Sequence, residues 1–336
     1  MRRRVIQFSH PGVEFPDRRP GADFKRKSNA HVEWNADGMS GIRYWNTRNS
    51  HFRKFIAMED LSYLVENETH PRKGLATFWG EWEPHSAFSV HQSTQGEFMV
   101  HKPFIDLNCA RPKKHNTDPF VYGNAFWYTD CKQARYRNVR ELAVSSLILF
   151  GTERPVDETF LLDTVFVVKR RHSYEEIFDL KEWGKLDAGL DFATISHGGL
   201  APEKKDFGFY EAQMFSEDQT YFSFVPCRSQ SGGSIAFHDR VALDVKEFGF
   251  SKISISKNGT KRGAGSVCMS VRPKGQNKRD ESHSAEDIQS LWTRIVELCY
   301  QQKFSLGVEI PRPGGLTSRI GFKAAHEKEN QINLNC

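Results

Sequence analysis

Two apolar runs separated by a polar turn dominate the pattern of the chain. Residues Leu142–Val168 read LAVSSLILFG, then TERPVDET, then FLLDTVFVV. Runs rich in β-branched and aromatic residues, on either side of a turn that contains proline, predict strands. Each run has about ten residues, half the roughly 20 that a membrane-spanning helix needs. We therefore expect Leu147–Phe150 and Phe160–Val168 to be adjacent antiparallel core strands, with Leu149, Leu162 and Val167 buried.

Shorter stretches of similar composition predict the other strands. They are Val5–Phe8, Gly74–Pro84, Ser86–Val100, Phe120–Thr129, Phe207–Phe215, Tyr221–Val225, Arg240–Val245, Lys252–Ser256, Ser266–Val271 and Leu306–Ile310.

The clearest helix is predicted over Ala285–Gln302. Ser284 is the expected N-cap and Asp287 stands at the acidic position of a capping box. Its apolar residues recur at helical spacing, at Ile288, Leu291, Trp292, Ile295, Val296 and Cys299. Shorter helices are expected after the Ser173–Glu176 capping box and over Phe52–Met58.

Strands outnumber helices and do not alternate with them, which predicts an α+β fold with mostly antiparallel sheet and a few flanking helices. We expect an aromatic-rich β-domain with a candidate ligand pocket over residues 1–172. An α+β domain packed on it is expected over residues 173–322, followed by a mobile tail at 323–336.

Composition adds the nature of a partner. The chain has 26 Phe, 7 Trp and a net charge of +5, so many rings must be buried or used in contacts. The basic residues cluster locally, at Arg2–Arg4, Arg18–Arg19, Lys25–Lys27, Lys113–Lys114, Lys169–Arg171 and in the glycine loop Lys257–Gly265. Each cluster alone is typical of a solvated surface, and together they suit a polyanionic partner.

Compartment is indicated by the termini and the cysteines. The N-terminal residues lack the apolar segment of a secretory signal, and the 6 cysteines form no CxxC pair. We expect reduced thiols and a cytoplasmic protein without membrane spans. Cys109, His115 and Cys131 match no zinc-site spacing, so neither a metal nor a cofactor is predicted.

A candidate pocket is centred on the sequence Trp79-Gly80-Glu81-Trp82. These rings fill the core in one interpretation, which is favoured for Trp82. In the other interpretation, a planar base stacks on the ring and Glu81 accepts a hydrogen bond from an exocyclic amine of that base. For Trp79 the two interpretations are equally favoured. The remaining candidate ligand-binding residues are Arg53 and Lys54 at the rim, with Asn116, Asp118 and Phe120.

Residues 74–170 resemble the PUA-like superfamily, including its EVE and ASCH branches. The resemblance lies in ILFG, a turn and FLLDTVFVV, preceded by the aromatic stretch Thr77–Trp82. Ser145-Ser146 stands where such domains have Gly-Asp. The resemblance implies a small barrel that binds RNA or a modified base.

No familiar catalytic motif is present. The leading hypothesis is a nucleic-acid-associated protein that recognises a base or nucleotide, modified or not, in an aromatic pocket. One alternative is an enzyme acting on nucleotides or modified nucleic acid, such as an N-glycosidase, nuclease or transferase, using Glu81, Asp118 or Asp163. The other is a protein-interaction subunit. Asp163 interrupts an apolar strand and needs a buried partner, by default a structural hydrogen bond.

Overall fold

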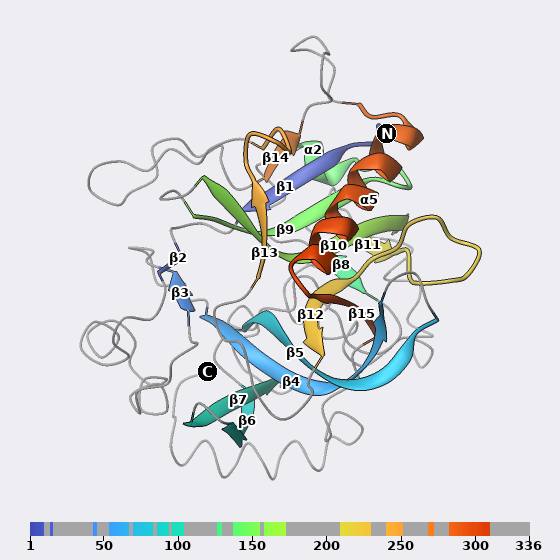
Figure 1. The fold of residues 1–336 in the computed structure, drawn as a ribbon. Helices are drawn as coiled ribbons and strands as arrows, with labels where there is room; N and C mark the ends of the chain where they lie inside the picture. Colours follow the sequence, from blue (N-terminus) through green and yellow to red (C-terminus); the bar gives the residue numbers. More distant parts are fainter. Residues whose placement is uncertain are drawn as a thin grey trace, which may run out of the picture.

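In its described residues, the computed structural model contains two large β-sheets, a hairpin and one long helix (Figure 1). It describes residues 1–9, 14–15, 43–45, 54–66, 70–82, 86–93, 96–103, 126–129, 137–154, 158–172, 209–229, 240–250, 268–271 and 282–309. The predicted strand Lys252–Ser256, the helix after Ser173 and the tail at 323–336 lie outside these ranges. Among the described helices, none is long and apolar enough to cross a membrane.

The larger sheet has seven strands. Its order is β14 (Cys268–Val271), β1 (Val5–Ser9), β9 (Leu147–Arg154), β10 (Thr159–His172), β11 (Phe209–Ala212) and β8 (Trp127–Thr129), with β13 (Val241–Asp244) paired to β10. Strands β1 and β9 are parallel, whereas the other neighbours are antiparallel.

The central strand pair confirms the prediction from the apolar runs. Strands β9 and β10 are antiparallel neighbours, with Leu149 opposite Val165 and Leu147 opposite Val167. Leu149 is 0% exposed, and Leu162 and Val167 are each 1% exposed. The register shifts between Leu162 and Thr164, so Asp163 is the extra residue of a β-bulge.

One face of this sheet packs on helix α5 (Ala285–Gln301). Ser284 caps the helix as predicted, and its capping box with Asp287 is formed in both directions. Ile288, Trp292, Ile295, Val296 and Cys299 are buried in the same core as the strand residues Leu149 and Val167. Trp292 Nε1 donates a 2.8 Å hydrogen bond to the Phe222 carbonyl, which satisfies the indole N–H in the core.

An aromatic cluster covers the opposite side of the central strands. The rings of Phe8, Phe150, Phe166, Tyr128 and Tyr210 meet with centroids 4.9–6.4 Å apart. The buried Tyr210 hydroxyl donates to the Val139 carbonyl at 2.7 Å and accepts from the Leu142 amide at 3.0 Å. These bonds fasten the segment that leads into β9 to strand β11.

The second sheet has six strands. Its order is β15 (Ser305–Glu309), β12 (Val225–Ser229), β5 (Arg72–Trp82), β4 (Lys54–Val65), β3 (Arg43–Trp45) and β2 (Glu14–Phe15), and β15 also pairs with β4. Strands β6 (Ser86–Ser93) and β7 (Gly96–Pro103) form a separate hairpin, and α2 is the short helix Arg137–Arg140.

Three sequence predictions of local structure were wrong. The single strand predicted over Ser86–Val100 is instead a hairpin of two antiparallel strands, β6 and β7. The segment expected to be helical around Phe52–Met58 enters strand β4, which pairs with β5 from Lys54 to Leu64. Long-range pairing there outweighs the local helical spacing. The strand predicted over Tyr221–Val225 instead begins at Val225, while Phe224 makes an isolated bridge to Val165.

The sheet-rich α+β class is confirmed, and no closed barrel is found among the described strands. Strand β5 lies in the six-stranded sheet, whereas β9 and β10 lie in the seven-stranded one. Each sheet takes strands from both sides of residue 172. These non-local pairings bring the ends of distant strands together.

Candidate functional site

Four of the predicted pocket residues lie on the paired strands β4 and β5. In the backbone register Lys54 is opposite Trp82, and Trp79 is opposite Ala57. Glu81 is opposite Phe55. The register therefore places Lys54 at the end of the two strands where the tryptophan-rich stretch lies. The other four candidates, Arg53, Asn116, Asp118 and Phe120, are outside the described residues.

The buried partner of Asp163 is the guanidinium group of Arg240. Its Oδ1 lies 3.0 Å from Nη1 of Arg240, and the side chains are only 7% and 1% exposed. The bulge in β10 and the position of Arg240 immediately before β13 bring the two together. A carboxylate that is buried against an arginine is held as a charged structural group, which does not favour Asp163 as a catalytic residue.

Basic residues that are distant in sequence gather at one end of the seven-stranded sheet. Because β1 and β9 are parallel, Arg2–Arg4 run beside the segment that leads into β9, where Arg2 bridges Leu142. Because β10 is antiparallel to β9, its last residues end at the same place, and the Ser145 amide donates to the Val168 carbonyl. We call this cluster the basic end, and it comprises Arg2, Arg3, Arg4, Arg140, Lys169, Arg170 and Arg171.

Two hydrogen bonds fix parts of the basic end, and several of its side chains are exposed to solvent. Arg171 Nε donates to the Arg140 carbonyl at 3.1 Å, and the Arg4 amide donates to Ser146 Oγ at 3.1 Å. Arg2, Lys169 and Arg170 are exposed. The cations outnumber the described carboxylates at this end, which are Glu141, Glu211, Glu286 and Asp287.

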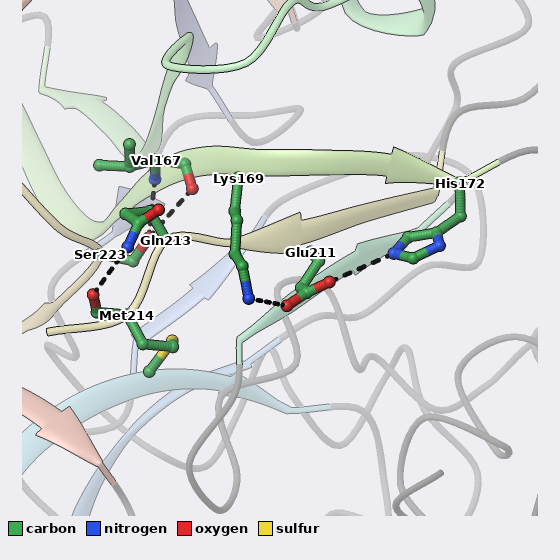
Figure 2. A network of polar contacts seen from close by, with 7 residues as sticks. All are labelled: Val167, Lys169, His172, Glu211, Gln213, Met214 and Ser223. Carbon is green, nitrogen blue, oxygen red and sulfur yellow. Dashed lines mark hydrogen bonds and ion pairs between the residues drawn. The ribbon is translucent and has the colours of Figure 1, made fainter. Parts of the chain in front are cut away.

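A three-residue polar array lies within the basic end (Figure 2). Lys169 Nζ donates to Glu211 Oε1 at 2.6 Å, and His172 Nε2 lies 3.3 Å from Glu211 Oε2. Lys169 and His172 both come from β10, whereas Glu211 comes from β11. The carboxylate thus lies between two nitrogen groups of one neighbouring strand.

The environment of the array differs between its two sides. The Lys169 side chain is 52% exposed, whereas that of His172 is 7% exposed. The His172 ring lies 5.5 Å from the ring of Trp127, tilted by 40°. Its Nδ1 atom is buried and has no hydrogen-bond partner among the described residues. The imidazole is therefore fixed by packing and by one polar contact, at Nε2.

Glu211 is ionised through the whole ordinary pH range. The hydrogen bond from His172, followed by that from Lys169, lowers the pKa of Glu211 to about 2, against the opposing effect of burial. This carboxylate can therefore accept hydrogen bonds from both Lys169 and His172 at any physiological pH.

The sequence analysis named Lys169 within a basic cluster but missed His172 and Glu211. A polar residue between apolar neighbours on a predicted strand, as in Phe209-Tyr210-Glu211-Ala212, is a weak signal by itself. Only the pairing of β10 with β11 brings Glu211 to His172, and that pairing has no local sequence signature.

The two thiols that the structure describes as free are buried and unreactive. Cys227 and Cys299 are buried free thiols. Burial raises the pKa of Cys227 to about 12 and raises that of Cys299 as well, so neither is a thiolate nucleophile near neutral pH. No group of three or more His, Cys, Asp or Glu suited to a metal ion occurs among the described residues.

Comparison of the chain with protein-family models, curated proteins and solved structures finds no match.

Proposed function

We propose that the protein binds nucleic acid and that the basic end contacts the phosphate backbone. The observation that carries the proposal is the convergence of Arg2–Arg4, Arg140 and Lys169–Arg171 at one end of the seven-stranded sheet. Arginine and lysine supply most protein contacts to phosphate, because their charges displace counterions condensed on the polyanion. Each basic run alone is typical of a solvated surface, whereas the two runs together form one positively charged surface.

Recognition of a base is the finer part of the proposal. The paired strands β4 and β5 carry Lys54, Trp79, Glu81 and Trp82 at neighbouring register positions. Stacking on an aromatic ring is worth about 1–3 kcal/mol per base and tolerates any sequence. In this proposal a tryptophan of β5 stacks on a base, modified or not, while Glu81 accepts a hydrogen bond from the base edge.

The test is the salt dependence of binding to a short labelled duplex DNA and to a single-stranded RNA. We expect affinity to fall steeply as salt increases, with a slope of log K against log salt that reflects the phosphates contacted. Replacing Arg170 and Arg171 together by Gln should weaken binding and reduce the magnitude of that slope by about 0.7–0.9 for each lost contact.

A matched control changes the charge equally at another basic cluster. The variant Lys25→Gln, Arg26→Gln tests a cluster outside the described residues, and a larger effect there would move the phosphate site away from the basic end. If neither the duplex DNA nor the single-stranded RNA binds at low salt, nucleic-acid binding is refuted.

A further inference from the structure

Lys169 and His172 share one carboxylate. Glu211 contacts Lys169 Nζ through Oε1 at 2.6 Å and His172 Nε2 through Oε2 at 3.3 Å. Figure 2 marks both contacts with dashed lines. With His172 neutral, the single negative charge of Glu211 is balanced by Lys169. With His172 protonated, two cations adjoin one carboxylate, so one positive charge of the array is left uncompensated.

Burial determines which cation keeps the carboxylate. His172 is 7% exposed and packs against Trp127, so a charged hydrogen bond from its Nε2 acts in a low local dielectric and is strengthened. The Lys169 side chain is 52% exposed, and an exposed lysine pair contributes little net stability. A protonated His172 therefore keeps its hydrogen bond to Glu211, while the ion pair between Lys169 and Glu211 breaks at a small cost in free energy.

The protonated imidazole depends on Glu211 in turn. Within the part of the chain that the structure describes, Nδ1 of His172 has no hydrogen-bond partner, so a proton there would be a buried donor without a described acceptor. Such a donor costs about 1–3 kcal/mol. The negative charge of Glu211 offsets this cost.

The other charged or titratable groups near the array also come from known elements. Strand β10 contributes Arg170 and Arg171, and β11 contributes Tyr210. Helix α2 contributes Arg140 through the Arg171 contact, and Glu141, which follows this helix, acts on Tyr210 through its charge. Burial, above all other causes, raises the pKa of Tyr210 to about 12, so Tyr210 stays neutral. Strand β8 contributes Trp127, which does not titrate.

We propose that protonation of His172 releases Lys169 from Glu211 to bind a phosphate group, so that the basic end binds nucleic acid more tightly as the pH falls. This inference rests on the proposed function and adds a proton-controlled phosphate ligand to it. Linkage requires the converse as well, because a phosphate that takes Lys169 leaves Glu211 to its other partner, and His172 gains a proton on binding.

The experiment measures the affinity of the full chain for oligothymidylate, whose bases do not titrate, at pH 8 and at pH 5.5. The wild-type protein should bind roughly three- to tenfold tighter at pH 5.5, with a salt slope larger in magnitude by about 0.7, as for one added single-strand phosphate contact. His172→Gln retains an amide donor toward Glu211 but cannot titrate, so this increment should disappear and the affinity should stay at its pH 8 level.

Glu211→Gln gives the opposite fixed state. Lys169 then has no carboxylate to leave, so the variant should bind at pH 8 as tightly as the wild-type protein does at pH 5.5, with little further change. His70→Gln is the matched control, since His70 is also paired with a glutamate, Glu217, on an exposed surface. It should leave the pH dependence unchanged.

The outcomes separate the two proposals. Binding that depends on Arg170 and Arg171 but keeps its full pH dependence in His172→Gln overturns the proton switch and leaves the proposed function intact. A Glu211→Gln protein that binds more weakly than the wild-type at pH 8 also overturns it. Loss of all oligothymidylate binding at low salt in the wild-type protein removes both.

Discussion

Asp163 and Arg240 form an ion pair in the interior, with Nη1 of the arginine 3.0 Å from Oδ1 of the aspartate. Asp163 occupies the bulge of β10, and Arg240 precedes the residue that pairs with Leu162. Two charges removed from water in this way depend on each other, because desolvation of either one alone is costly.

Removal of one partner should therefore destabilise the fold strongly. Arg240→Met leaves the carboxylate of Asp163 in the interior, and we expect a loss of about 3–5 kcal/mol in the free energy of unfolding. The double variant Asp163→Leu, Arg240→Met removes both charges and should recover most of that loss. Urea unfolding at neutral pH measures both changes.

A surface pair on the neighbouring strand ends serves as the control. Lys246 contacts Glu158 at 2.8 Å, with the lysine side chain 73% exposed. Lys246→Gln should leave the unfolding midpoint almost unchanged. An equal effect of the Lys246 and Arg240 replacements would show that burial does not set the strength of the interior pair.

Glu211 predicts a pH dependence of stability with a definite sign. Its pKa in the folded protein is about 2, below the ordinary value of 4.5. The carboxylate therefore contributes stability that is complete above about pH 4.5 and is lost as the pH falls toward 2. Discounted for partial exposure, the contribution is roughly 1–2 kcal/mol.

Urea unfolding of wild-type protein and Glu211→Gln at a series of pH values measures this contribution. The wild-type should be the more stable at pH 7, and the difference should shrink steadily below pH 4.5. A difference that grows as the pH falls from 4.5 to 2 would contradict the lowered pKa of this carboxyl.

Gly151 is predicted to tolerate no side chain. A Cβ atom there would lie 2.2 Å from the Leu161 carbonyl oxygen and 2.8 Å from the Phe160 ring. Because the nearest atom is backbone of the paired strand, Gly151→Ala should cost about 3 kcal/mol or more, the upper end of overpacking effects. Thermal melting of the purified variant checks this.

Gly74 is the matched control for that replacement. A Cβ at Gly74 would meet the end of the flexible Arg72 side chain at 3.1 Å and a Leu64 methyl at 3.3 Å. Gly74→Ala should therefore melt within a few degrees of the wild-type protein. A similar loss of stability in both variants would mean that alanine is disfavoured in these strands for a reason other than contact.

The elements that could be predicted are those with a strong local pattern. The apolar runs of β9 and β10 and the capped amphipathic helix α5 each contain enough periodicity to define themselves. The segment from Lys54 to Met58 does not, because its aromatic and apolar residues fit a helical face as well as a strand. Its conformation is decided by five register pairs with β5, whose partners are 20 (78 − 58) to 28 (82 − 54) positions away along the chain.

The sequence predicted less of the candidate site than of the fold. Arg2–Arg4 and Lys169–Arg171 are visible as basic runs, but only the parallel pairing of β1 with β9 puts them at one end of a sheet. Asp163 was expected to have a buried partner, yet nothing local identifies Arg240, 77 positions further on (240 − 163). Side-chain constellations that join distant strands depend on topology, which a single sequence does not specify.

Trp79 provides the decisive test of base recognition on β5. Position 79 has the parity of Leu75, which is 42% exposed, whereas position 82 has the parity of Ala76, which is 0% exposed. Side chains alternate along a strand, so we predict a ligand role for Trp79 and a core role for Trp82. Trp79→Ala should weaken oligothymidylate binding, by roughly 1–3 kcal/mol for one lost stacking contact, and leave the melting temperature nearly unchanged.

Trp82→Ala is the comparison, and a core ring lost from that position should cost roughly 3–5 kcal/mol of stability. Thermal melting and ligand titration on the two variants separate packing from recognition. A large loss of stability in Trp79→Ala, with unchanged affinity in the protein that remains folded, would show that this ring is packing and that base recognition lies elsewhere. The opposite pattern, with weak binding by a fully stable Trp79→Ala protein, would establish β5 as the strand on which a base stacks.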